Sequence, residues 1–110
     1  MKNGPVGSAR GIPDVSAVAD PNSGVWIYDS AAGGWIVVGG TSVATPVWAG
    51  IGNAAASFAG LSPAELMTLY QDQGTTPITM GTCGPNQGYL AVGAWNFCTG
   101  LGSPLSEGGK

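Results

Sequence analysis

The chain has 110 residues, enough for one ordinary domain. Charged residues make up only 8% of it, against about a quarter in an average protein, and 20 residues are glycine. The formal net charge of −3 offers no basic patch to neutralise phosphates, so nucleic acid is not an expected partner. No apolar run reaches membrane-spanning length and no signal peptide is recognisable, so no membrane partner is expected.

The first part of the chain predicts short strands. Residues 12–19 alternate apolar and small side chains, which favours a strand. Residues 20–24, Asp-Pro-Asn-Ser-Gly, combine a fixed φ with residues that tolerate unusual backbone angles, so they predict a turn. The apolar runs 25–28 and 35–38 flank a polar, glycine-containing stretch, and this arrangement predicts a β-hairpin.

Residues 39–46 read Gly-Gly-Thr-Ser-Val-Ala-Thr-Pro and predict a sharp turn followed by a helix. We expect the helix to run from Ser42 to about residue 59, with Pro46 in its first turn, where the missing N–H costs nothing. Apolar residues recur on one face at helical spacing: Val43, Val47, Ile51, Ala54 and Phe58. Because the other faces carry alanine and glycine, we expect this helix to be buried against a large sheet.

Ser42 at this helix start has two interpretations. Thr41 or Ser42 can simply cap the helix, as these residue types often do. Alternatively, Ser42 is a nucleophile, because unpaired N–H groups and the positive end of the helix dipole favour negative charge near its hydroxyl. Under the second interpretation, Gly40 and Thr41 support the turn and the oxyanion site.

A second helix is predicted from Ser62 to Gly74. Ser62 and Glu65 have the spacing of a capping box, and Pro63 fits the first helical position. Leu66, Leu69 and Tyr70 would form its apolar stripe, and Gly74 its stop. This spacing favours a capping role for Glu65 over that of a catalytic acid.

Trp48 and Trp95 could line a substrate groove, although burial is the commoner fate of tryptophan.

Three stretches resemble the C-terminal part of a sedolisin, a serine-carboxyl peptidase: residues 10–21, 39–50 and 98–104. Their order and spacing are those of the family, and the resemblance covers almost the whole chain. Gly-Thr-Ser-x-x-x-Pro also occurs in subtilisins, which usually follow the proline with a histidine. Here Val47 and Trp48 follow Pro46, and the chain contains no histidine.

The resemblance implies an α/β unit, the C-terminal portion of a subtilisin-like fold, with strands and a hairpin before a buried nucleophile helix and a second helix. We expect it to span residues 12–104, between a flexible lead-in at 1–11 and a tail at 105–110. The family hydrolyses peptide bonds of peptides and proteins at acid pH, and its members are generally secreted. The few ionisable groups of this chain would suit an acidic medium.

The resemblance makes Ser42 the acyl-forming nucleophile but does not supply its partners. Sedolisins use a glutamate as the base, an aspartate that orients it and a further aspartate in the oxyanion site, all upstream of the serine. None of the six acids matches these motifs: Asp14, Asp20, Asp29, Glu65, Asp72 and Glu107. Asp14 lies in a Pro-Asp-Val-Ser run that sedolisins carry outside their catalytic set, so we expect it to be structural.

The resemblance also implies a degenerate calcium site, so we expect no metal or other cofactor. Sedolisins bind one calcium ion through an aspartate in an Asp-Ile-Thr run, backbone carbonyls and an aspartate after a tryptophan. Pro77 and Asn96 replace the two aspartates here, leaving the carbonyls of Ile78, Val92 and Ala94. Because calcium affinity depends on ligand charge, we expect binding to be weak.

Cys83 and Cys98 are the only cysteines and lack the spacing of a metal pair. In an exported protein we expect them to pair, which the chain-entropy model values at about 3 kcal/mol for such a loop. In a reducing cytosol they would be small buried apolar residues.

The sequence therefore predicts a fragment of an acid-acting serine-carboxyl endopeptidase that is inactive without its Glu and Asp partners. Its expected partners are a peptide or protein substrate and the N-terminal part of the catalytic domain. One alternative is a peptidase-derived module that only folds or binds. Another is a Trp-rich secreted binding domain unrelated to peptidases.

Overall fold

The computed structural model describes residues 8–56, 58–71 and 74–105. The chain is of mixed α/β type, with two helices and three two-stranded antiparallel sheets among these residues. Sheet pairing is β1 with β2, β3 with β6, and β4 with β5. In chain order the elements are β1 (Val25–Asp29), β2 (Gly34–Val38), α1 (Thr41–Ala54), α2 (Ser62–Gln71), β3 (Thr75–Thr76), β4 (Thr82–Cys83), the 3₁₀ turn η1 (Pro85–Gln87), β5 (Tyr89–Leu90) and β6 (Ser103–Pro104).

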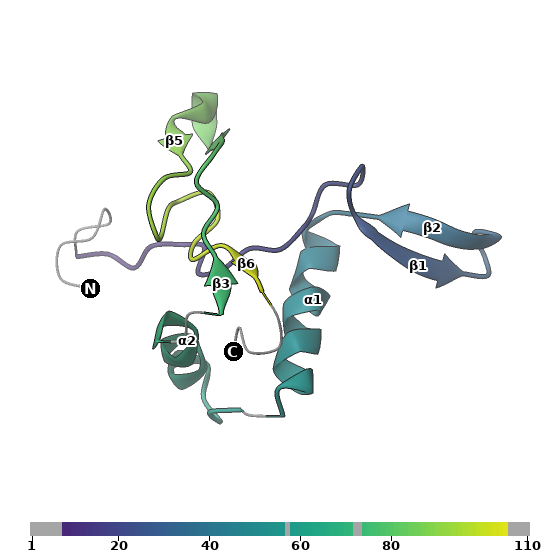
Figure 1. The fold of residues 1–110 in the computed structure, drawn as a ribbon, viewed down its shortest axis with the longest axis horizontal. Coiled ribbons are helices and arrows are strands. Elements are labelled where there is room, and N and C mark those ends of the chain that lie inside the picture. The colour runs from purple at the N-terminus through teal and green to yellow at the C-terminus, as the bar shows by residue number, and fades with distance from the viewer. Residues whose placement is uncertain (1–7, 57, 72–73, 106–110) are drawn as a thin grey trace.

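The predicted hairpin is confirmed, and each strand is one residue longer than expected. Trp26 lies opposite Val37, and Tyr28 lies opposite Trp35. Because opposed residues share a face of an antiparallel pair, three aromatic rings gather on one side. The rings of Tyr28 and Trp35 make an edge contact at 5.6 Å between centroids. The hairpin projects away from the rest of the chain, beyond α1 (Figure 1).

The predicted turn before the hairpin is also present. The Asp20 carboxylate accepts a hydrogen bond from the Asn22 backbone N–H at 2.9 Å, and the Asp20 carbonyl accepts one from the Ser23 N–H at 3.2 Å. A short side chain that bonds its own backbone two residues on is a common way to fix such a turn. This turn leads the chain directly into β1.

The strand predicted at residues 12–19 is wrong. This part of the chain is irregular and pairs with no strand among the described residues. A strand needs a neighbour along its edge, and the alternating pattern alone cannot supply one. Instead, the backbone N–H and carbonyl of Ser16 each make one hydrogen bond, to different parts of the chain. Its N–H donates to the Gly102 carbonyl at 2.9 Å, and its carbonyl accepts from the Trp48 indole at 2.9 Å.

The burial predicted for the first helix is wrong as well. Of the 14 residues of α1, Gly52 is the one that is buried. The helix ends at Ala54 rather than near residue 59, so Phe58 lies beyond it and is 66% exposed. An apolar helix face is buried only where another element covers it, and sheets of two strands offer little area for this.

The second helix begins at Ser62, as predicted, and ends at Gln71; the predicted stop follows residues outside the described part of the chain. The Glu65 carboxylate accepts from the Ala59 backbone N–H at 3.0 Å. Glu65 therefore reaches back to the loop before the helix, which supports its structural role.

In the described part of the chain, no helix combines the length and apolarity needed to cross a bilayer.

The described residues bury very little apolar surface. Leu69 and Ala91 are the buried hydrophobic residues among them. The radius of gyration is 15.5 Å, whereas a compact chain of this length has about 13 Å. Fifteen large hydrophobic side chains of the described residues are exposed: Ile12, Val18, Trp26, Ile27, Tyr28, Trp35, Val37, Phe58, Leu61, Met67, Met80, Tyr89, Leu90, Val92 and Leu105. The fold is open, and its apolar faces lack a cover within this part of the chain.

We expect Trp26→Thr to leave stability almost unchanged, because this ring is 63% exposed. The free energy of unfolding should change by under ~0.5 kcal/mol, and binding of an apolar fluorescent dye should fall. The matched variant Trp95→Thr removes a half-buried ring whose indole N–H donates to the Pro13 carbonyl. It should lower the free energy of unfolding by about 2–4 kcal/mol. Urea denaturation measures both. Equal losses would contradict the exposed position of the hairpin.

Candidate active site

Two glycines place the start of α1 against an earlier part of the chain. A Cβ at Gly39 would lie 2.5 Å from the Pro21 nitrogen, so no side chain fits there. Gly40 has φ of 95°, a conformation that favours glycine, and its N–H donates to the Ala19 carbonyl at 2.6 Å. The sharp turn predicted before Ser42 is therefore present, and it is held by residues 19–21.

The helix begins one residue earlier than predicted, at Thr41, and no side chain caps it. The Gly40 carbonyl accepts from the N–H groups of Val43 at 2.9 Å and Ala44 at 3.2 Å. The capping interpretation of Thr41 and Ser42 is therefore wrong. Pro46 lies in the second turn instead of the first, and its missing N–H leaves the Ser42 carbonyl without the usual helix partner.

Ser42 is exposed as the second residue of α1. Its hydroxyl and its backbone N–H, like the N–H of Thr41, have no hydrogen-bond partner in the described part of the chain. The N-terminus of a helix carries partial positive charge, so these N–H groups can stabilise an anion beside the hydroxyl. These N–H groups are placed to donate hydrogen bonds to an oxyanion, but the start of the helix offers no group that could take the proton of the Ser42 hydroxyl.

Every carboxylate that the structure describes is engaged elsewhere. A histidine cannot act as the base either, because the sequence contains none. Asp72 and Glu107 lie outside the described residues. The partners of the four described carboxylates are Arg10 and Tyr70 for Asp14, Asn22 for Asp20, Ala31 for Asp29 and Ala59 for Glu65.

A groove of about 430 Å³ runs between α1 and residues 13–19. Ser42 is not among its lining residues, so the groove lies on a neighbouring face of the helix. Its lining is mostly apolar and small: Pro13, Val15, Ser16, Ala17, Ala19, Thr41, Ala44, Thr45, Trp48 and Cys98. Trp48 lines it as a half-buried side chain and donates its indole N–H to the Ser16 carbonyl.

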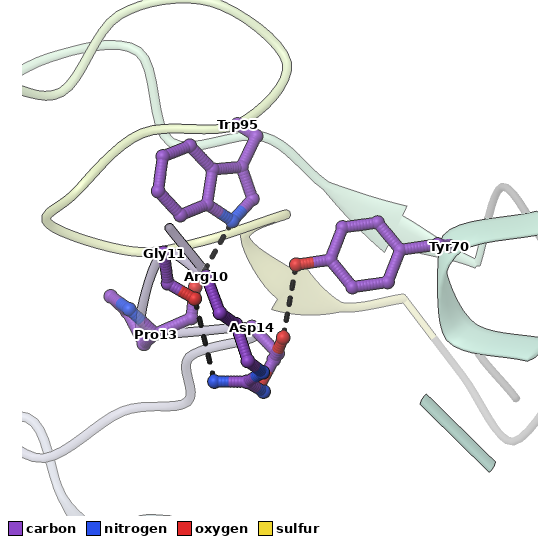
Figure 2. A network of polar contacts seen from close by, with 6 residues as sticks. All are labelled: Arg10, Gly11, Pro13, Asp14, Tyr70 and Trp95. Carbon is purple, nitrogen blue, oxygen red and sulfur yellow. Dashed lines mark hydrogen bonds and ion pairs between the residues drawn. The ribbon is translucent and has the colours of Figure 1, made fainter. Parts of the chain in front are cut away.

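Asp14 joins three parts of the chain, as Figure 2 shows. Its carboxylate pairs with the Arg10 guanidinium and accepts from the Tyr70 hydroxyl of α2 at 3.0 Å. Next to it, the Trp95 indole donates to the Pro13 carbonyl at 3.0 Å. These contacts support a structural role for Asp14, and they favour packing over substrate binding for Trp95.

The environment of Tyr70 raises the pKa of its hydroxyl above the ordinary value of 10.0. Burial is the largest cause, because it disfavours the charged phenolate. The hydrogen bond to Asp14 and the negative charge of that carboxylate act in the same direction, while Trp95 and Arg10 act weakly against them. Neutral Tyr70 is therefore the form that holds the Asp14 contact.

The residues at the expected calcium site do not fit a cation. Asn96 is 4% exposed, and its side-chain oxygen already accepts from the N–H groups of Cys98 and Thr99, each at 3.0 Å, and from the Thr99 hydroxyl at 3.1 Å. Its amide NH₂ donates to the Ile78 carbonyl at 3.1 Å. A donor therefore faces the carbonyl that was expected to bind the ion. Among the described residues, no three metal-binding side chains of the His, Cys, Asp or Glu type come together.

Cys83 and Cys98 form a disulfide in the structure, across 15 residues. Cys98 also contacts the Tyr89 carbonyl through its sulfur. Beside it the rings of Tyr89, Phe97 and Trp95 follow one another at 5.1 Å between successive centroids. The C-terminal loops are thus held by the disulfide and by aromatic rings in tilted and edge contacts, with little regular structure.

Sequence reasoning missed the partners of Asp14 and the central place of Asn96. Arg10 precedes Asp14 by four residues, a spacing that brings side chains together on a helix, but this segment is irregular and gave no such signal. No local signal could have linked Tyr70 to Asp14, because 56 residues separate them.

Comparison with known proteins relates the chain to a bacterial protein. Over 105 residues the chain is 36% identical to kumamolisin from Bacillus sp. (strain MN-32). The match covers 90% of this chain but only 19% of that protein. No family model matches the chain, and no solved structure matches it significantly. The match to kumamolisin supports a relationship to the sedolisins, whose motifs residues 10–21, 39–50 and 98–104 resemble.

At alkaline pH the protein should become less stable as Tyr70 loses its proton, and we expect Tyr70→Phe to remove this pH-dependent loss. Because folding raises the pKa of Tyr70, the hydroxyl contributes its full stabilisation below pH 10.0 and loses it as the pH rises through the higher folded pKa. The variant should be less stable than wild type at pH 8 and should lose less on going above pH 10. Urea denaturation across this range measures the effect.

Tyr28→Phe is the matched control, because Tyr28 is 65% exposed on the hairpin. This variant should keep the alkaline loss, since Tyr70 remains. An identical pH dependence in wild type and Tyr70→Phe would contradict the role of Tyr70.

Proposed function

We propose that this chain is the nucleophile-bearing part of a sedolisin-type serine-carboxyl endopeptidase, with Ser42 as the nucleophile. The observation that carries the proposal is the match to kumamolisin, a sedolisin, over 90% of this chain and 19% of that protein. The turn at Gly39 and Gly40, which leaves the Ser42 hydroxyl exposed at the start of a 14-residue helix, supports it.

In the proposed reaction, the Ser42 hydroxyl attacks the carbonyl carbon of a peptide bond and forms an acyl-enzyme. The hydroxyl proton passes to a carboxylate that another part of the catalytic domain supplies, and then to the leaving amine. The backbone N–H of Ser42 faces the developing oxyanion, helped by Gly40, whose conformation sets the turn. Water then releases the acyl group, and Ser42 regains its proton.

The chain by itself should not catalyse this reaction. A serine hydroxyl is a weak nucleophile until a base takes its proton, and the four described carboxylates are bound to other groups. The reaction therefore needs the N-terminal part of a catalytic domain as partner and a peptide or protein as substrate. Secretion, which the family relationship suggests, would also keep the Cys83–Cys98 disulfide oxidised.

A second candidate is a peptidase-derived module that binds or folds without catalysis. The exposed aromatic face of the hairpin favours it, because Trp26, Tyr28 and Trp35 are each more than 60% exposed. Exposed apolar surface of this kind marks contact with another polypeptide. The two candidates differ in one respect: whether Ser42 reacts once the missing carboxylates are supplied.

We expect the isolated chain to cleave no denatured protein substrate between about pH 2 and pH 8. In a chimera in which this chain replaces the matched region of kumamolisin, we expect acid proteolysis. Ser42→Ala should lower the activity of the chimera at least about a thousandfold. Release of acid-soluble peptides measures both.

Ser62→Ala is the matched control, because Ser62 also begins a helix and lies outside the proposed site. It should leave the activity of the chimera within about twofold. Ser42-dependent turnover by the isolated chain would overturn the need for an external base. A chimera that folds and binds substrate but does not cleave it would favour the non-catalytic module.

A further inference from the structure

Asn96 is the buried polar residue among those that the structure describes. All four of its hydrogen-bonding groups are used. Its backbone N–H and carbonyl exchange bonds with Gly100 at 3.2 and 2.9 Å, which closes the turn of residues 96–100. Its side chain then bonds inside that turn and across to a separate segment.

The chemistry of its neighbours fixes which way the amide of Asn96 points. Two backbone N–H groups, those of Cys98 and Thr99, can only donate, so they require the oxygen on their side. The Ile78 carbonyl can only accept, so it requires the NH₂ group. Turning the amide over would set donor against donor and acceptor against acceptor. An aspartate could meet the first requirement but not the second.

The bond to Ile78 crosses 18 residues and joins the segment after β3 to the turn of residues 96–100. The bond from the Cys98 N–H holds the backbone of the residue that bridges to Cys83. A buried amide that is fully bonded is strongly tied to one geometry, because each unmet bond would carry a desolvation cost. A cation could bind between Ile78 and Asn96 only by displacing the donor that already bonds to the carbonyl.

We propose that the Asn96 amide is a metal-independent crosslink that joins the Ile78 segment to the 96–100 turn and positions Cys98 for its disulfide with Cys83. Its NH₂ group takes the place of a bound cation, because it satisfies the Ile78 carbonyl oxygen with a hydrogen bond. This region then keeps its structure without calcium. The inference depends on the contacts of Asn96 and does not need Ser42 to be a nucleophile.

The test compares Asn96→Asp with Asn86→Asp in the full chain. The first keeps the size and the acceptor oxygen but sets a carboxylate against the Ile78 carbonyl. The second makes the same change at an exposed position in η1. The readout is the rate at which dithiothreitol reduces the Cys83–Cys98 disulfide under native conditions, with 1 mM calcium chloride or with a chelator.

The wild-type rate should be the same, within about twofold, with calcium and with chelator, and Asn86→Asp should match it. With chelator present, the disulfide of Asn96→Asp should be reduced about tenfold faster than that of the wild type, since the buried NH₂ donor and its bond to Ile78 are lost. A wild-type rate that calcium slows about tenfold would overturn the metal-independent crosslink. So would an Asn96→Asp variant that is reduced as slowly as wild type.

Thr99→Val keeps the test decisive if circular dichroism shows that Asn96→Asp does not fold. This variant removes one of the three donors to the Asn96 oxygen and leaves the bond to Ile78 in place. We expect reduction about threefold faster than in wild type, again independent of calcium. An unchanged rate would overturn the proposal.

Discussion

The backbone of residues 13–16 is the constraint on which the other parts of this fold depend. Together with the Asp14 carboxylate it contacts α1 through Trp48, α2 through Tyr70, and the C-terminal loops through Trp95 and Leu101. Three of these four contacts are made to backbone carbonyls, which no substitution in the segment removes directly. An extended backbone offers donors and acceptors on both edges, so it can serve several partners at once even without a sheet.

This segment can be approached so closely only because glycine faces it. A Cβ at Gly100 would lie 2.2 Å from the Asp14 carbonyl oxygen, and Gly100 has φ of 60°. Glycine has the same role at β3, where a Cβ at Gly102 would meet the Thr76 carbonyl oxygen at 1.9 Å. A close contact at glycine also sets the position of Ser42, because Gly39 packs against the backbone of Pro21. Several of the 20 glycines thus mark the places where two backbones touch, and their cost in chain entropy is offset by those contacts.

What the sequence predicted correctly was local. The hairpin, the turn at Asp20 and the helix starts follow from patterns within a few residues, and the structure has all three. The strand at 12–19 and the burial of α1 failed because both require a distant partner that a local pattern cannot supply. The same limit applied to the candidate site. The turn that precedes Ser42 was recognisable from its neighbours, whereas the bond between Tyr70 and Asp14 spans 56 residues.

The distribution of polar and apolar contacts supports the proposal that this chain is part of a larger unit. Its junctions between distant segments are well bonded: the side chains of Asp14 and Asn96 and the Cys83–Cys98 disulfide each fix one. Hydrogen bonds contribute about 1 kcal/mol each after the loss of water is counted, so they specify geometry more than they stabilise it. Burial of apolar surface supplies most of the net stability, and here the hairpin and α1 leave that surface open. A polypeptide that covers α1 and the hairpin would stabilise this fold. Under the proposed function, the same polypeptide would carry the carboxylates of a sedolisin and so supply a base to Ser42.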